Sequence, residues 1–295
     1  MIRAQARDPW SAVENAAELV ARVAARVAVA SGVGRVRLKG FGWVRNDRHQ
    51  YRVRSRSAIQ LRSLKTADHV FRISINQEDA VIDDALEIFS SLESGTRGAA
   101  LTGGWAAVEG LLLRRSERHV IAADRLAAIV ACAFPRAQLT TLSYRHRPVM
   151  QDDLATALDG IAVNHERCRL LEEHIRDGAL PVLPRPSDQA MLRRVESMIA
   201  SPADKIGNVR RYVGDTLRRL YTQRNLIMHA GSFQSVTMKA TLRTAPRLVA
   251  AGVDRIVDAR MNQQRLDPLA LAARAEAELG LLGTPASRAL SDLLD

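Results

Sequence analysis

The sequence predicts a mainly α-helical protein, a helical bundle preceded by a small basic segment that contains short β-strands. Two patterns support this prediction. From Glu78 onward, apolar residues recur at the three- and four-residue spacing of helices that bury one face. Between Arg35 and Ile75, turn-forming residues separate short stretches in which apolar and charged residues alternate, as is typical of strands. No apolar run approaches the roughly 20 residues of a membrane-spanning helix.

The N-terminal element is expected to be an amphipathic helix from Asp8 to about Ser31. Asp8 is a suitable N-cap, and Pro9 fits the first helical position because its missing amide hydrogen is not needed there. Apolar residues then recur at helical spacing, namely Trp10, Val13, Ala17, Val20, Val23 and Val27. The glycines at 32 and 34 should end the helix.

The stretch from Arg35 to Ile75 is expected to form short strands, arranged as a small meander. Apolar residues alternate with arginines, and glycines and the pair Asn46-Asp47 supply turn signals. The aromatic residues of this stretch are Phe41, Trp43, Tyr51 and Phe71. They could stack on nucleic-acid bases, or they could form the hydrophobic face of a small sheet, which is the interpretation that we favour.

Most of the net charge of +11 lies in this same stretch. Between Arg35 and Arg72 there are eleven basic residues and two acidic ones, a net charge of +9. Arginine is abundant throughout the chain, so its clustering is more informative than its number. The cluster indicates a polyanionic partner, of which nucleic acid is the obvious kind, although an acidic protein remains an alternative. The candidate RNA-binding residues here are Arg45, Arg48, Arg52 and Arg54.

The remainder of the chain is expected to form a series of helices. The predicted ranges are Ala80–Leu92, Ala99–Arg115, Val120–Phe134, Asp152–Asp177, Gln189–Ala200, Ala203–Ala230 and Thr237–Gln263, followed by short helices to the C-terminus. The third helix should stop at Pro135, since proline cannot donate a backbone hydrogen bond. We therefore expect an N-terminal segment over residues 1–76, a helical domain over 77–235, and C-terminal helices over 236–295 that pack on the bundle.

The composition indicates a cytoplasmic protein without a bound metal. The first eight residues lack the apolar core of a signal peptide. Cys132 and Cys168 are far from any CxxC spacing, so we expect reduced, buried thiols. The seven histidines are scattered and lack paired acidic ligands at useful spacing. No metal or other cofactor is therefore expected.

The stretch from Tyr221 to Gly231 carries the candidate chemistry. Arg224, Asn225 and His229 lie within one and a half helical turns, directly before a glycine that can end the helix. On a helical wheel, Asn225 and His229 share a polar stripe that also contains Arg211, Asp215, Arg218 and Thr222. Arg224 instead points toward the apolar face, where a guanidinium requires a partner.

Two explanations for Arg224 are open. The helix could be interrupted between Thr222 and Asn225, which would turn Arg224 toward His229. Alternatively, Arg224 could pair with a carboxylate, for which Glu109 on a preceding helix is the best candidate. Glu109 would then have either a structural or a catalytic role.

These residue types suit metal-free cleavage of RNA, which carries its own nucleophile in the 2′-hydroxyl group. A histidine can remove that proton or donate one to the leaving 5′-oxygen, and an arginine can neutralise charge on the phosphate. Asn225 could orient the imidazole or contact the phosphate. The alternative for His229 is a favourable interaction with the helix dipole and nothing more. Arg211 and Arg218 could guide RNA to the site or simply be solvated.

This stretch resembles the HEPN superfamily, whose ribonuclease members carry an arginine, often followed by asparagine, and then a histidine after four to six intervening residues. Arg224, Asn225 and His229 match that pattern, and Tyr221 precedes it by three residues. The segment from Leu101 to Leu112, which contains Glu109, is similar to the early helix of HEPN domains. The resemblance covers roughly residues 80–233. The spacing alone also occurs at Arg62/His69, Arg114/His119 and Arg167/His174, so the surrounding residues carry the resemblance.

The resemblance implies a HEPN-like helical bundle that dimerises, so that two Arg/His motifs meet in a composite cleft. It implies a metal-independent endoribonuclease that leaves a 2′,3′-cyclic phosphate, with catalytic roles for Arg224, Asn225 and His229. Glu109 and Tyr221 would support them. HEPN ribonucleases often act as toxins or as effectors of defence against phage and plasmids, so we expect RNA, a second copy and a regulatory partner protein or activator as partners.

Two other functions remain open on the sequence alone. The chain could be a catalytically inactive HEPN-like subunit that binds nucleic acid or serves in assembly. It could also be a DNA-binding regulator that uses the basic segment, although the sequence contains no clear helix-turn-helix signature.

Overall fold

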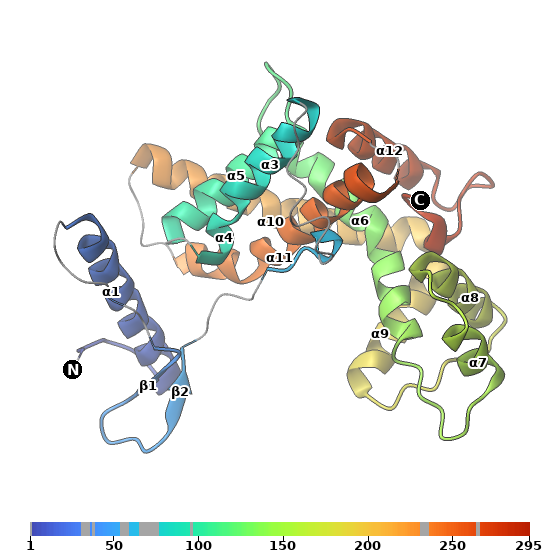
Figure 1. The fold of residues 1–295 in the computed structure, drawn as a ribbon, viewed down its shortest axis with the longest axis horizontal. Coiled ribbons are helices and arrows are strands. Elements are labelled where there is room, and N and C mark those ends of the chain that lie inside the picture. The colour runs from blue at the N-terminus through green and yellow to red at the C-terminus, as the bar shows by residue number, and fades with distance from the viewer. Residues whose placement is uncertain are drawn as a thin grey trace. The chain divides into compact units, whose positions relative to one another are not determined.

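The computed structural model describes residues 2–30, 36, 39–53, 59–64, 77–94, 97–230, 236–263 and 266–295. It is mainly α-helical with a small N-terminal β-segment, as predicted (Figure 1). The chain forms two compact units, residues 1–58 and residues 59–295. Among the described helices, none is long and apolar enough to cross a membrane.

The first unit begins with helix α1 (Pro9–Val29), which starts where the sequence predicts. The Asp8 side chain accepts a hydrogen bond from the Ser11 amide at 2.9 Å, which satisfies one of the unpaired donors of the first turn. Pro9 occupies the first turn, where its fixed backbone angle suits the helix. The predicted capping signal is therefore confirmed.

Strands β1 (Phe41–Trp43) and β2 (Gln50–Arg52) form an antiparallel hairpin in the same unit. Tyr51 packs edge-to-face on Trp10 of α1, with 5.1 Å between the ring centroids. Phe41 and Trp43 contact each other in the same geometry but are exposed. Tyr51 thus packs against the helix, whereas the pair Phe41 and Trp43 is largely open to solvent. Phe71, with the rest of residues 65–76, lies outside the described residues.

The second unit contains the helical bundle. Its elements are η1 (Arg62–Leu64), α3 (Gln77–Phe89), α4 (Ser91–Ser94), α5 (Arg97–Leu112), α6 (Val120–Ser143), α7 (Asp153–Asp159), α8 (Asn164–Arg176), α9 (Pro186–Ala200), α10 (Pro202–Ala230), α11 (Val236–Asp258), the π-helical turn η2 (Ala259–Gln263), α12 (Pro268–Leu281) and η3 (Leu290–Asp292).

Helix α6 is the centre of this unit. It contacts α5, α8, α9, α10, α11 and α12, and in Figure 1 it extends from the region of α5 to that of α8 and α9. Its side chains Leu126, Ile129, Leu139 and Leu142 are fully buried. Each such side chain contributes about 1.5–3 kcal/mol by its removal from water. Gly252 of α11 allows a close approach, since a Cβ atom there would lie 2.2 Å from Leu126 Cδ1.

The prediction that a helix stops at Pro135 is wrong, because α6 continues through it to Ser143. A proline inside a helix costs about 3 kcal/mol, since it removes a hydrogen bond and crowds the preceding turn. Here Cys132 and Leu139, on either side of Pro135, are fully buried against neighbouring helices. This burial on both sides of the proline offsets the local cost.

The prediction of one helix over Asp152–Asp177 is also wrong, because the chain forms α7 and α8 with a break at residues 160–163. The buried Arg167 explains the break. Its guanidinium donates hydrogen bonds to the carbonyl groups of Leu158 and of Ile161, the latter at 3.1 Å. These bonds satisfy carbonyl groups that a continuous helix would have used internally.

The segments after residue 235 belong to the same unit as the preceding helices. Helix α11 contacts α5, α6 and α10, and α12 contacts α5, α6 and α10. The C-terminal tail is fixed by a buried carboxylate of α8, since Glu172 accepts hydrogen bonds from the amides of Leu290 at 3.1 Å and Ser291 at 2.7 Å. The C-terminal helices are therefore an integral part of the bundle.

Candidate functional site

Helix α10 carries the candidate residues, and its two faces differ as the helical wheel predicts. Leu217 and Leu220 are fully buried, and Val213 is nearly so. The polar stripe that begins with Arg211 lies on the exposed side. This amphipathic helix packs on α5, α6 and α11, which fixes the position of its C-terminal turns.

Arg224 lies between the two faces of α10 and has two partners. Its Nη1 atom donates a hydrogen bond to Asn225 Oδ1 at 3.0 Å, and its Nη2 atom lies 3.9 Å from Glu109 Oε2. The side chain of Arg224 is 26% exposed and that of Glu109 is 16% exposed. Because α10 is uninterrupted from Pro202 to Ala230, the pairing with Glu109 is the explanation that the structure supports, and the helix does not restart near Thr222.

Glu109 also binds a histidine that was not among the predicted site residues. His119 Nδ1 lies 2.5 Å from Glu109 Oε1, so the two oxygens of one carboxylate face a guanidinium and an imidazole. His119 is the N-cap of α6, at the end of the short loop after α5. The loop reverses the chain, and this brings His119 beside a residue ten positions earlier. From the sequence alone, the one signal at His119 was its distance from Arg114, which fits the Arg/His pattern.

One aromatic ring stacks on the His119 ring, and a second aromatic ring supports the first. Tyr221 of α10 stacks on His119, with 6.0 Å between the centroids and 17° between the ring planes. Tyr221 in turn packs against the fully buried Trp105 of α5 at 5.1 Å. The predicted supporting residues Glu109, on α5, and Tyr221, on α10, therefore both contact His119. Glu109 also lies beside Arg224.

His229 lies in the last turn of α10 and is exposed. It follows Arg224 by five residues, which places the two side chains about 140° apart around an unbroken helix. Within the described part of the chain, the side chain of His229 has no hydrogen bond or ion pair. Asn225 precedes it by one turn on the same side. The structure thus groups Arg224 with Asn225 and Glu109, and it leaves His229 separate. Gly231 lies outside the described residues.

The arginines predicted to bind RNA differ in their availability. Arg218 is bound by two carboxylates, Asp124 at 2.5 Å and Asp215 at 3.2 Å. Arg211 donates to Asn208 Oδ1 at 2.8 Å and lies over the exposed ring of Tyr212. Arg211 is therefore the better phosphate ligand of the two, since the charge of Arg218 is already compensated.

In the first unit, Arg45, Arg48 and Arg52 are all exposed, and Arg54 lies outside the described residues. The hairpin turn between them contains Asp47, which accepts hydrogen bonds from Tyr51 and His49. The hydrogen bond from the Tyr51 hydroxyl is the main cause that lowers the pKa of Asp47 to about 2. This carboxylate orders the turn and leaves the arginine side chains directed to solvent.

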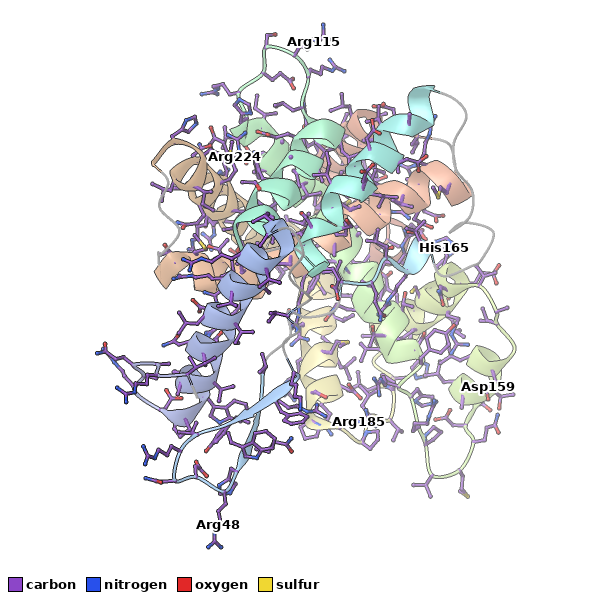
Figure 2. All side chains as sticks on the ribbon, turned by 60° about the vertical axis from the view of Figure 1, so that its left-hand side comes forward. Arg48, Arg115, Asp159, His165, Arg185 and Arg224 are labelled. Atoms are coloured by element: carbon purple, nitrogen blue, oxygen red, sulfur yellow. The ribbon has the colours of Figure 1, made fainter. Side chains whose placement is uncertain are left out.

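A second ion pair fixes the loop that presents His119. Glu117 binds the Arg125 guanidinium through both carboxylate oxygens, at 2.5 and 2.8 Å, and accepts a hydrogen bond from the Arg114 amide at 2.8 Å. The hydrogen bond from Arg125 is the main cause that lowers the pKa of Glu117 to about 2. Figure 2 shows Arg115 of this loop and Arg224 at one end of the second unit, with Arg185 and Asp159 at the other.

Glu117→Gln is expected to lower the melting temperature at neutral pH, and the difference from the wild type should shrink in acid. The pKa of Glu117 in the folded state is lower than its ordinary value of 4.5, so the ionised group stabilises the fold above that value. This stabilisation is lost as the pH falls toward about 2. Thermal melting of both proteins between neutral and acidic pH tests this expectation.

Glu173→Gln is the matched control for that experiment. Glu173 is an exposed carboxylate on α8, where a substitution is expected to change stability little. If the difference in melting temperature between Glu117→Gln and the wild type stays constant over the whole pH range, the ionised Glu117 does not stabilise the loop.

Within the described residues, no three or more His, Cys, Asp or Glu side chains lie together in an arrangement that could hold a metal ion. Cys132 and Cys168 are both buried free thiols, and burial is the main cause that raises the pKa of each. Buried thiols of this kind are poor nucleophiles and poor metal ligands.

Comparison of the chain with family models, with curated proteins and with solved structures gave no match.

Proposed function

We propose that this protein is a metal-independent endoribonuclease that acts as a pair of identical chains. The observation that carries the proposal is the grouping of Arg224, Asn225 and Glu109 at one end of a helix whose last turn exposes His229. Asn225 Oδ1 accepts the hydrogen bond from Arg224, so its amide NH2 group is oriented to donate to a phosphate oxygen. Arginine and amide together form a suitable clamp for one phosphate of RNA.

The reaction needs only proton transfer and charge stabilisation. The 2′-hydroxyl of the substrate loses its proton, the 2′-oxygen bonds to phosphorus, and the bond from phosphorus to the 5′-oxygen breaks. The leaving 5′-oxygen takes up a proton, and the products carry a 2′,3′-cyclic phosphate and a 5′-hydroxyl group. Arg224 stabilises the negative charge that develops on the phosphate, and His229 transfers a proton.

The direction of the two side chains explains why the proposal requires two copies. Arg224 and His229 of one chain diverge by about 140° around α10, so one chain does not direct both at a single phosphate. A two-fold axis near the end of α10 would bring His229 of one copy toward Arg224 of the other. Leu226 and Met228 in this turn are 41% and 58% exposed, which gives such an interface apolar side chains to bury.

The resemblance to HEPN ribonucleases suggests a cellular role for this activity. We propose that the protein is a toxin or an effector of defence against phage, controlled by a partner protein or an activator. The exposed arginines of the first unit would hold the RNA through its backbone phosphates, without sequence preference.

The proposal is tested by His229→Ala, compared with the wild type in EDTA on a labelled RNA pool. Cleavage should fall by about 10²–10⁴-fold, as expected when a general acid or base is removed, while RNA binding stays unchanged. His174→Ala is the matched control, because His174 also follows an arginine, Arg167, within the four-to-six-residue range of the motif but lies on α8. Equal cleavage by wild type and His229→Ala would contradict the assignment. RNA binding without cleavage would favour an inactive subunit that binds nucleic acid.

A further inference from the structure

One carboxylate connects the arginine of the proposed site to a second histidine. Glu109 Oε2 lies 3.9 Å from Arg224 Nη2, and Glu109 Oε1 lies 2.5 Å from His119 Nδ1. All three side chains are fixed by helices of the same unit, since Glu109 is on α5, His119 caps α6 and Arg224 is on α10. The guanidinium that would bind a phosphate and the imidazole of His119 therefore meet at one carboxylate.

The hydrogen bond to Glu109 determines which nitrogen of His119 is available. A neutral imidazole that faces a carboxylate through Nδ1 carries its hydrogen on that atom, so Nε2 has the free lone pair. The described residues provide no partner for Nε2, and the His119 side chain is 51% exposed. A carboxylate in this position also stabilises the positive charge that the ring gains when Nε2 accepts a proton.

The ring is held in a defined plane, as proton transfer requires. Tyr221 stacks on one face at 6.0 Å and is itself supported by the buried Trp105. In the described structure Glu109 on α5 and Tyr221 on α10 contact the ring, and Arg224 on α10 lies at the other oxygen of Glu109. In the adjoining loop, Glu117 is occupied by Arg125, so it does not compete for the imidazole.

We infer that His119 is the general base of the proposed reaction and that Glu109 is the residue that positions it. Nε2 of His119 accepts the proton of the 2′-hydroxyl group as the 2′-oxygen bonds to phosphorus. His229 then has the complementary role and donates a proton to the leaving 5′-oxygen. This inference rests on the proposed function and specifies which histidine performs which proton transfer.

The test is the pH dependence of kcat/KM for full-length His119→Ala and His119→Asn on a defined RNA in EDTA. Asparagine preserves a hydrogen-bond donor for Glu109 but cannot accept the proton, so a purely structural role would leave His119→Asn active. We expect both variants to lose about 10²–10⁴-fold and to lose the acidic limb of the profile, which reports ionisation of the base. His174→Ala should behave like the wild type, and thermal melting shows whether each variant is folded.

A substrate with sulfur in place of the leaving 5′-oxygen separates the two histidines, because a thiolate leaves without a proton. The sulfur substrate should restore cleavage by His229→Ala and should not restore cleavage by the His119 variants. Restored cleavage by the His119 variants, wild-type activity in them, or an acidic limb that persists would overturn the inference and leave the proposed function intact. Absence of cleavage by the wild type would overturn both.

Discussion

Arg224→Ala is expected to lower kcat/KM for RNA cleavage by about 10²–10³-fold, because it removes the charge that stabilises the phosphate in the transition state. Arg224→Lys should restore little of this loss, since a lysine ammonium cannot bind Asn225 and Glu109 and also present a planar pair of donors to phosphate. Single-turnover kinetics in EDTA measure the effect. Arg211→Ala is the control, and it should change RNA affinity more than the rate of cleavage.

Mixing Arg224→Ala with His229→Ala tests whether the site is shared between two copies. Each variant alone should be inactive. After subunit exchange, a heterodimer contains one cleft with an intact Arg224 from one copy and an intact His229 from the other. If exchange is random, roughly a quarter of all clefts in the mixture should be intact, and about that share of the wild-type activity should return. Absence of any recovery in a mixture that is shown to have exchanged would contradict a composite cleft.

Glu172→Ala is expected to destabilise the second unit by about 2–5 kcal/mol, since it leaves two backbone amides without their acceptor at about 1–3 kcal/mol each. Glu172 is 2% exposed and binds the amides of Leu290 and Ser291 together with the Arg176 guanidinium. Its loss leaves these donors unsatisfied and releases the C-terminal tail from α8. Chemical denaturation followed by circular dichroism measures the change.

Glu173→Ala is the matched control for this prediction, because Glu173 is the exposed neighbour of Glu172 on the same helix. Its effect should stay within about 0.5 kcal/mol. A destabilisation of less than about 1 kcal/mol for Glu172→Ala would show that the tail does not depend on this carboxylate.

Elements with clear local signals could be predicted from the sequence. The N-terminus of α1 follows from Asp8 and Pro9, and the faces of α10 follow from its periodicity. The errors arose where a distant residue overrides the local signal. Pro135 is tolerated because the helix around it is buried, and the break between α7 and α8 depends on hydrogen bonds from Arg167.

The same distinction applies to the candidate site. The pairing of Arg224 with Glu109 could be anticipated, because a guanidinium on an apolar face requires a carboxylate from a neighbouring helix. The contact of His119 with Glu109 could not be anticipated, because the position of His119 depends on the path of the loop after α5 and on the stacking with Tyr221. Likewise, only the packing of α6 on α10 brings Asp124 to Arg218 and compensates its charge.

The chemical nature of the ends that the wild-type protein leaves on RNA in EDTA is the most direct test of the central claim. Attack by the 2′-hydroxyl group predicts a 2′,3′-cyclic phosphate on one fragment and a 5′-hydroxyl on the other, with no need for added metal. Fragments with a 5′-phosphate, cleavage that requires a divalent metal ion, or no cleavage by the folded, dimeric protein would each contradict it.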